Sequence, residues 1–317
     1  MMKLAPVVLF AYNRPDTLRK TLEALSANDL STETELFVYS DGPKPNADAL
    51  TKDKIAQVRA LARERNWCGK VTIVEADQNK GLARSIIEGV TKTVNAYSKV
   101  IVVEDDAVVS KHFLRFMNDA LEMYKDDARV QSIGSWNYFC DPKLLDGNFF
   151  YRFPDSIAWG TFDRAWKLFE SDSEVALRNI QASGKLTRFD GELKYPYFSN
   201  MLKLQAEGKI NSWAIRWTAT AIIHDMLSFF PKQTLSVHIG FGDDATHERM
   251  DDYNAALILA EAPLQVQRVP VQESEIAITQ WRKFVNRHFV PKISLRTRIS
   301  RIVRFFIPAL PNKNKAS

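Results

Sequence analysis

The chain has 317 residues, of which 45% are hydrophobic and 26% are charged, and its formal net charge is +5. This composition indicates a globular protein that is long enough to bury a substantial core. Its two cysteines have no metal-ligand or disulfide spacing, and no run approaches the ~18 apolar residues of a membrane span. We therefore expect a cytoplasmic protein in a reducing compartment.

Strand and helix patterns alternate through the first 135 residues. Apolar strand-like runs occupy residues 5–12, 35–39, 71–75, 99–103 and 130–133. The segments between them have helical spacing, as at Leu18, Leu22 and Leu25. This alternation predicts a parallel sheet built from right-handed βαβ units.

The fourth of these strands runs into three acids. Residues 100–103 are apolar, and Glu104, Asp105 and Asp106 follow directly. Ligands of open α/β sheets bind beyond the carboxyl ends of the strands, where acids suit a hard cation that carries substrate phosphates. If the strand stays extended, Glu104 and Asp106 share one side and Asp105 takes the other. The alternative is a solvated acidic turn.

Other polar residues follow the neighbouring strands. Asp41 ends the second strand, where it could accept hydrogen bonds from a base or a ribose, or form an Asx turn before Gly42. Arg14, Lys80 and Arg84 follow the first and third strands. Each alone could be a surface charge, but together at one rim they favour an anionic nucleotide ligand.

The pattern loosens after Gly134, where aromatic residues become frequent and loops that cover a site are expected. Helical spacing returns at 162–169 and 196–206. The glycine-rich stretch 236–247 ends at His247, which could reach a metal or phosphates or be polar surface. Asp243 and Asp244 could act in acid–base chemistry or solubilise the loop, and His238 is expected to be structural.

The end of the chain is basic and amphipathic. Ten Lys and Arg residues follow Trp281, and no acid follows Glu275. This composition favours an interfacial segment attracted to anionic lipid, with nucleic acid or a packing helix as alternatives. Such a segment would place the protein at the inner face of the cell membrane.

These motifs resemble the GT-A superfamily of nucleotide-sugar glycosyltransferases. The run Val103-Glu104-Asp105-Asp106 with Ser135-Trp136-Asn137 is similar to the β-1,2-N-acetylglucosaminyltransferase I type, which carries an E-D-D motif and a later S-A-W-N. Residues 10–15 and 79–83 look like bacterial family 2-like transferases that act on surface polysaccharides. The resemblance implies a Rossmann-like, mostly parallel central sheet flanked by helices, an irregular acceptor-side half, and a bound Mn²⁺ or Mg²⁺.

The resemblance also implies roles for single residues. Asp106 would ligate the metal, Asp105 would contact the ribose, and Glu104 would support them. Asp41 and Arg14 would flank the base, with Arg84 nearby. Trp159 and Gly160 would line the sugar pocket, because 156–166 resembles the segment over the donor sugar.

The catalytic base has no clear match. In the N-acetylglucosaminyltransferase I type an Asp stands just before a Trp, whereas this chain has Asn211 and Ser212 before Trp213. The substitutes, which the sequence does not rank, are Asp155, Asp190, Glu192, Asp243 and Asp244.

The sequence thus predicts a metal-dependent inverting glycosyltransferase that moves a sugar from a UDP-sugar to a glycan or lipid-linked saccharide, without a nucleic-acid partner. The expected domain covers residues 1–255, with a nucleotide-binding half to 135 and an acceptor-side half after it; 256–317 form an extension. The alternatives are a sugar-nucleotide- or glycan-binding protein without activity and a sugar nucleotidyltransferase. Against the latter, the loop after the first strand has no glycine.

Overall fold

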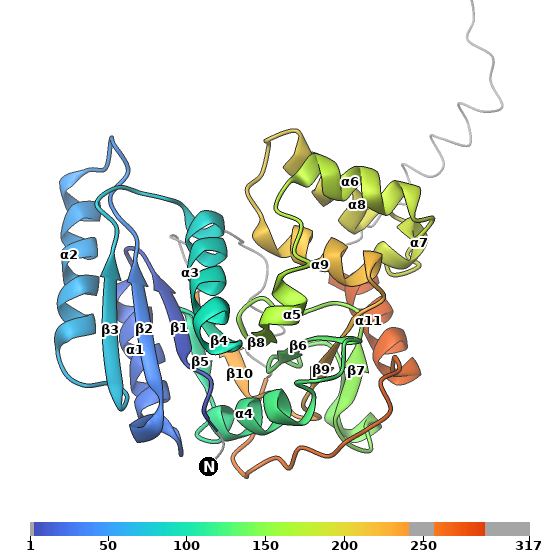
Figure 1. Ribbon diagram of the computed structural model, residues 1–317, viewed down its shortest axis with the longest axis horizontal. Coiled ribbons are helices and arrows are strands. Elements are labelled where there is room, and N and C mark those ends of the chain that lie inside the picture. Colours follow the sequence, from blue (N-terminus) through green and yellow to red (C-terminus); the bar gives the residue numbers. More distant parts are fainter. Residues whose placement is uncertain (1–2, 241–256, 289–317) are drawn as a thin grey trace, which may run out of the picture.

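The structure is a computed structural model that describes residues 3–240 and 257–288. One eight-stranded sheet runs through the molecule, in the order β3-β2-β1-β4-β8-β6-β9-β7 (Figure 1). Its strands are β1 (Val7–Ala11), β2 (Glu35–Ser40), β3 (Lys70–Glu75), β4 (Lys99–Glu104), β6 (Val130–Gly134), β7 (Phe149–Tyr151), β8 (Ala158–Phe162) and β9 (Leu227–Phe230). A separate two-stranded sheet joins β5 (Ala107–Val109) to β10 (Ser236–His238).

The helices are α1 (Pro15–Ser26), α2 (Ala49–Arg63), α3 (Leu82–Tyr97), α4 (Phe113–Met123), α5 (Asp163–Trp166), α6 (Ser173–Ala182), α7 (Leu186–Phe189), α8 (Tyr197–Ala206), α9 (Trp213–Ile223) and α11 (Glu275–His288), with short 3-10 turns η1 (Ser31–Glu33) and η2 (Pro142–Leu144). No helix of this described set is long and apolar enough to cross a membrane.

The predicted parallel half is confirmed. β1 pairs in parallel with both β2 and β4, and β2 pairs in parallel with β3. The chain therefore proceeds outward from β1 to β3 and then returns to the other side of β1 as β4. This reversal creates a topological switch point between the carboxyl ends of β1 and β4, where open α/β sheets hold their ligands.

Alternating side chains give this half two buried faces. Val7 and Leu9 of β1 pack with α1, α2 and α4, whereas Val8 and Phe10 pack with α3, α5 and α9. Side chains of an extended strand point alternately to opposite faces, so a strand covered on both sides is apolar throughout. The sheet is thus the middle of three layers (Figure 1).

The half after Gly134 is more regular than the sequence predicts. β8 pairs antiparallel with both β4 and β6, and β7 pairs antiparallel with β9, inside the region expected to form covering loops. Helical spacing was expected from 162, but the helix α5 spans only 163–166, because β8 continues through Phe162. β8 is buried along its whole length, which explains its apolar composition.

The described part of the C-terminal extension packs on this second half. Trp281, Phe284 and Val285 of α11 belong to a core cluster with Tyr151 and other residues of β7 and its surroundings. The apolar face of α11 is therefore covered by protein and is not free for a membrane, which corrects the interfacial prediction for 281–288. Residues 289–317 and the predicted domain boundary at 255 lie outside the described residues.

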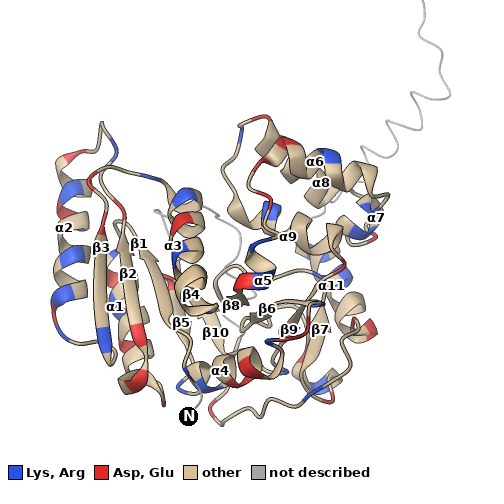
Figure 2. Cartoon of the chain, viewed as in Figure 1, with Lys and Arg blue, Asp and Glu red and all other residues tan. Residues whose placement is uncertain are grey.

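Among the residues that the structure describes, Lys and Arg are spread over both ends of the molecule. Figure 2 shows them on α2 at one end of the molecule and on α7 and α11 at the other. Several are paired with acids: Arg152, which is 4% exposed, bonds both Glu192 and Glu273 at 2.5 Å.

Candidate functional site

Arg14 and the acidic residues meet at the switch point between β1 and β4. Arg14 precedes α1, and its guanidinium bridges the carboxylates of Asp105 and Asp106. The distance from Arg14 Nη1 to Asp106 Oδ2 is 2.6 Å, and Nη2 bonds Asp105 Oδ1. Both aspartates are nearly inaccessible, at 3% and 2% exposure. The predicted convergence of these strand ends therefore produces a compact, buried ion cluster.

The predicted alternation of the three acids is wrong. β4 ends at Glu104, and the chain turns at Asp105 and Asp106 before β5 begins. Because the backbone is no longer extended, both aspartates reach the same guanidinium. Two-residue periodicity holds only within a strand.

His238 completes the cluster. β10 pairs antiparallel with β5, which sets His238 opposite Ala107, next to the acidic turn. Its Nε2 lies 3.0 Å from Asp106 Oδ2, and the amide of Ile239 donates to the Asp106 carbonyl at 2.8 Å. The expectation of a purely structural His238 therefore misses its contact with Asp106. His247, the predicted metal ligand, lies outside the described residues.

The chemistry of Asp106 fits a divalent cation whose remaining ligands come from a substrate. Its Oδ1 is buried and has no hydrogen-bond partner among the residues described, although buried carboxylate oxygens are normally satisfied. In the same ranges, no three His, Cys, Asp or Glu side chains form a ready cation cage. A cation with few protein ligands is typical of sites that bind Mg²⁺ together with phosphates.

Burial and neighbouring charges shift the pKa values of the three acids in different directions. Burial raises the pKa of Asp105 to about 6, although Arg14 opposes the rise. Burial also raises the pKa of Glu104 well above its usual value, and Asp106 and Asp105 add to that effect. For Asp106, burial is outweighed by His238 and Arg14, so its pKa is lowered. Asp106 is thus the member of the acidic motif best held in its ionised form.

Asp41 organises the loop before α3. Both of its oxygens are occupied: Oδ1 accepts from the amides of Gly42 and Lys80 at 2.8 Å, and Oδ2 accepts from the Gly81 amide at 2.9 Å and from Asn79 Nδ2 at 3.0 Å. Gly81 has φ +77°, a left-handed conformation that favours glycine. The carboxylate of Asp41 therefore joins the end of β2 to the loop that precedes α3.

Lys80 and Arg84 lie at the same end of α3 but do not reach the acid cluster in this structure. Both pair with Glu88, at 2.7 Å and 2.6 Å respectively. Asn211 lies near this loop, since a Cβ built on Gly81 would stand 3.9 Å from its Nδ2. Ser212 caps α9 by accepting from the Ile215 amide. Asn211, which precedes α9 where the N-acetylglucosaminyltransferase I type has its catalytic aspartate, thus lies beside the loop that Asp41 organises.

Trp159 and Gly160 lie in the core and not beside the acid cluster. Trp159 is 0% exposed and stacks on Trp213 with a ring separation of 5.1 Å. A Cβ on Gly160 would meet the Val100 carbonyl at 3.1 Å. The physical reason is that β8 is an interior strand, paired on both edges. These two residues therefore have no accessible surface with which to line the expected sugar pocket.

The described candidates for a base have structural partners. Asp155, 4% exposed, accepts from the amides of Ser135 and Trp136 at 3.0 Å and of Ile157 at 2.9 Å, and burial raises its pKa to about 6. Asp190 accepts from the amide and hydroxyl of Ser199, and Glu192 pairs with Arg152 and Arg282. Asp243 and Asp244 fall outside the described residues.

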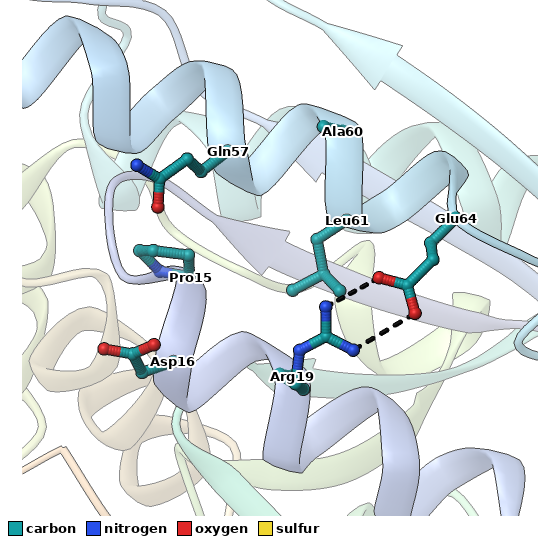
Figure 3. A pocket seen from close by; sticks show the side chains of 7 residues that line it. All are labelled: Pro15, Asp16, Arg19, Gln57, Ala60, Leu61 and Glu64. Atoms are coloured by element: carbon teal, nitrogen blue, oxygen red, sulfur yellow. Dashed lines mark hydrogen bonds and ion pairs between the residues drawn. The ribbon is translucent and has the colours of Figure 1, made fainter.

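A surface hollow between α1 and α2 shares no residue with the acid cluster. Figure 3 shows that it is crossed by an ion pair in which Arg19 donates to both oxygens of Glu64, at 3.1 and 2.6 Å. Both side chains are nearly half exposed. Such an exposed pair contributes little to stability. Arg19 therefore offers a reference for Arg14, which lies five residues earlier in the sequence.

Comparison with known proteins identifies the class. Residues 7–169, just over half of the chain, match glycosyl transferase family 2. The chain belongs to this family, and it is a glycosyltransferase of the predicted GT-A type. No curated protein matches the sequence.

Several solved structures are similar, though remote. TarS from S. aureus is 12% identical with a TM-score of 0.39, and the match covers 72% of this chain but 36% of TarS. The galactosyltransferase LgtC, in complex with donor and acceptor sugar analogs, is 10% identical with a TM-score of 0.37, covering 92% of this chain and 99% of LgtC. UDP-glucose pyrophosphorylase complexed with UDP-glucose is 11% identical with a TM-score of 0.33, covering 72% and 90%.

Proposed function

We propose that this glycosyltransferase moves a sugar from a UDP-sugar to a hydroxyl of a glycan or lipid-linked saccharide in surface polysaccharide synthesis. N-acetylglucosamine is the first sugar to test, because the acidic motif resembles that of N-acetylglucosaminyltransferase I. The observation that carries the proposal is the buried Asp106 at the switch point, with one oxygen on Arg14 and His238 and the other without a hydrogen-bond partner among the described residues.

In this proposal Asp106 and His238 hold Mn²⁺ or Mg²⁺ together with the donor diphosphate. When bound, the cation neutralises the departing nucleoside diphosphate. Asp105 contacts the ribose, with Glu104 as support. The Asp41 loop lies at the same rim and borders the base. Lys80 and Arg84 leave their ion pairs with Glu88 and bind the phosphates instead.

We propose inversion by single displacement, with a carboxylate that accepts the proton of the attacking hydroxyl. Asp155, Asp190 and Glu192 have their oxygens engaged by amides, a hydroxyl or guanidinium groups. Asp243 and Asp244 therefore become the preferred candidates for the base. They follow Gly240, which contacts Asp106 directly.

We also propose that the basic residues of 289–317 attract the enzyme to an anionic membrane surface. The support is the sequence itself, in which seven Lys and Arg residues occur without an acid: Lys292, Arg296, Arg298, Arg301, Arg304, Lys313 and Lys315. A lipid-linked acceptor would be found at such a surface.

A donor panel tests the proposed function. The full chain with Mn²⁺ is incubated with UDP-, GDP-, CMP- and dTDP-sugars, and release of the free nucleotide is measured with and without saccharide acceptors. We expect release from one or more UDP-sugars, stimulated by an acceptor. Release from only non-uridine donors would reject the UDP assignment, and binding of UDP-sugars without any release would favour the binding-protein alternative.

A further inference from the structure

Arg14 lies where a cation shared by the acidic motif would be held. Its two terminal nitrogens divide between Asp105 and Asp106, and the aspartate side chains are 4% and 3% exposed. Arg14 itself is 27% exposed, so one side of the guanidinium faces outward while the other faces the buried carboxylates. Arg14 thus provides the two acids with an internal counter-ion.

Arg14, His238 and Gly240 already surround one oxygen of Asp106, Oδ2. Asp106 Oδ2 already has two partners, Arg14 Nη1 at 2.6 Å and His238 Nε2 at 3.0 Å. Gly240 closes the other side, because a Cβ built on it would overlap Asp106 Oδ2 and stand 2.8 Å from Arg14 Nη1. A divalent cation placed beside the guanidinium would meet strong repulsion at such distances. Occupancy of the carboxylates by Arg14 and by a cation is therefore mutually unfavourable.

A nucleoside diphosphate offers Arg14 another partner. Guanidinium groups bind phosphate oxygens in the same forked geometry with which they bind carboxylates. Arg14 stands at the outer side of the cluster and immediately before α1, at the ligand-binding end of the sheet. A bound diphosphate therefore removes the counter-ion from the acids and at the same time supplies oxygens for the cation.

Taking the proposed donor site as given, we propose that Arg14 competes with the divalent cation for Asp106, so that cation and nucleotide bind with positive coupling. Arg14 is then a positioning residue: it keeps the two aspartates in place before the donor arrives. The coupling is reciprocal, since each ligand must raise the affinity of the other by the same factor.

The test measures Mn²⁺ affinity without any turnover. Free Mn²⁺ is followed by its electron paramagnetic resonance signal, with the full chain and with or without UDP. For the wild type we expect UDP to tighten Mn²⁺ binding by about tenfold, within the usual range of coupling. Arg14→Gln should bind Mn²⁺ about tenfold more tightly than the wild type without UDP, and UDP should then add little. Arg14→Lys keeps the charge without the fork and should fall between the two.

Arg19→Gln is the matched control, because it removes an arginine of α1 that pairs with Glu64 in the neighbouring hollow (Figure 3). It should leave Mn²⁺ affinity and its dependence on UDP unchanged. If Arg14→Gln and Arg14→Lys both fold, as judged by thermal unfolding, and bind Mn²⁺ no more tightly than the wild type without UDP, the competition is refuted, although the cation site of the proposed function stands. If Mn²⁺ binds none of the proteins even with UDP, the proposed cation site itself fails, and this inference fails with it.

Discussion

At the scale of single residues, the site joins three segments that are distant in the sequence. Arg14 follows β1, Asp106 follows β4, and His238 ends β10. The sequence predicts that the first two lie at one rim, because parallel strands end at the same edge of a sheet. It does not reveal His238, because the pairing of β10 with β5 brings together strands that are more than a hundred residues apart. A histidine in a short polar strand has no local signal for such a contact.

Gly240 should be required for activity because of its close approach to the cluster. In Gly240→Ala the added Cβ would overlap Asp106 Oδ2, so the carboxylate or the backbone must shift. Displacement of a reacting group by ~1 Å can cost about a hundredfold in rate, and we expect a loss of that size in kcat. Gly147→Ala is the control, because its Cβ would meet nothing within 4 Å. Equal activity of the two variants would contradict the placement of Gly240.

The two cysteines should be inert in the folded protein. Cys68 and Cys140 are free and buried, and burial raises the pKa of each thiol to about 12. Because the thiolate is the reactive form, neither thiol should react with a disulfide reagent at pH 8. In denaturant both should react within minutes. Fast reaction of a native thiol, counted by absorbance, would contradict the burial.

At the scale of elements, Asp155 fixes two loops at the centre of the sheet. Its carboxylate accepts hydrogen bonds from two amides just after β6 and from one just before β8, a strand that the sequence does not predict. The five residues of β8 are all buried, so their sequence has no two-residue period that would separate a strand from a covering loop. The antiparallel entry of β8 between β4 and β6 depends on these long-range contacts.

Asp155→Ala should therefore destabilise the fold. Removing the carboxylate leaves three buried amides without their acceptor, and we expect the free energy of unfolding to fall by about 3 kcal/mol. Asp172→Ala is a reference, since it removes an exposed N-cap of α6 worth about 1 kcal/mol. Urea denaturation of both variants would measure the difference. A smaller effect at Asp155 than at Asp172 would show that the amides find other partners.

At the scale of the whole molecule, the N-terminal half was predictable because each strand and helix is long and strongly patterned. The second half is built from short strands and from helices that pack in a core rich in aromatic residues, such as Phe153, Phe198 and Trp281. Such residues suit a core, a loop or an acceptor surface equally well in sequence. The start of the basic tail was ambiguous in the same way. Its apolar residues suggest a membrane-facing surface, but those of α11 pack against the protein.

The residues that attract the protein to a membrane should lie beyond His288. A chain that ends at His288 keeps Trp281 and Phe284 in the core, whereas an earlier end would remove them. We expect the full chain to sediment with vesicles of anionic lipid and the shortened chain to remain largely in solution, because each Lys or Arg near such a surface contributes about 1 kcal/mol. Equal sedimentation of the two chains would reject the membrane proposal for 289–317. Vesicles of neutral lipid provide the control.

The central claim is that Asp106 holds a cation needed for sugar transfer. Release of UDP from the active donor is measured for the wild type with Mn²⁺, the wild type with EDTA, and Asp106→Asn with Mn²⁺, each protein having first been shown to fold. Arg19→Gln serves as a surface reference. We predict that EDTA and Asp106→Asn each abolish release, while Arg19→Gln retains it. Release that persists in both EDTA and Asp106→Asn would contradict the account.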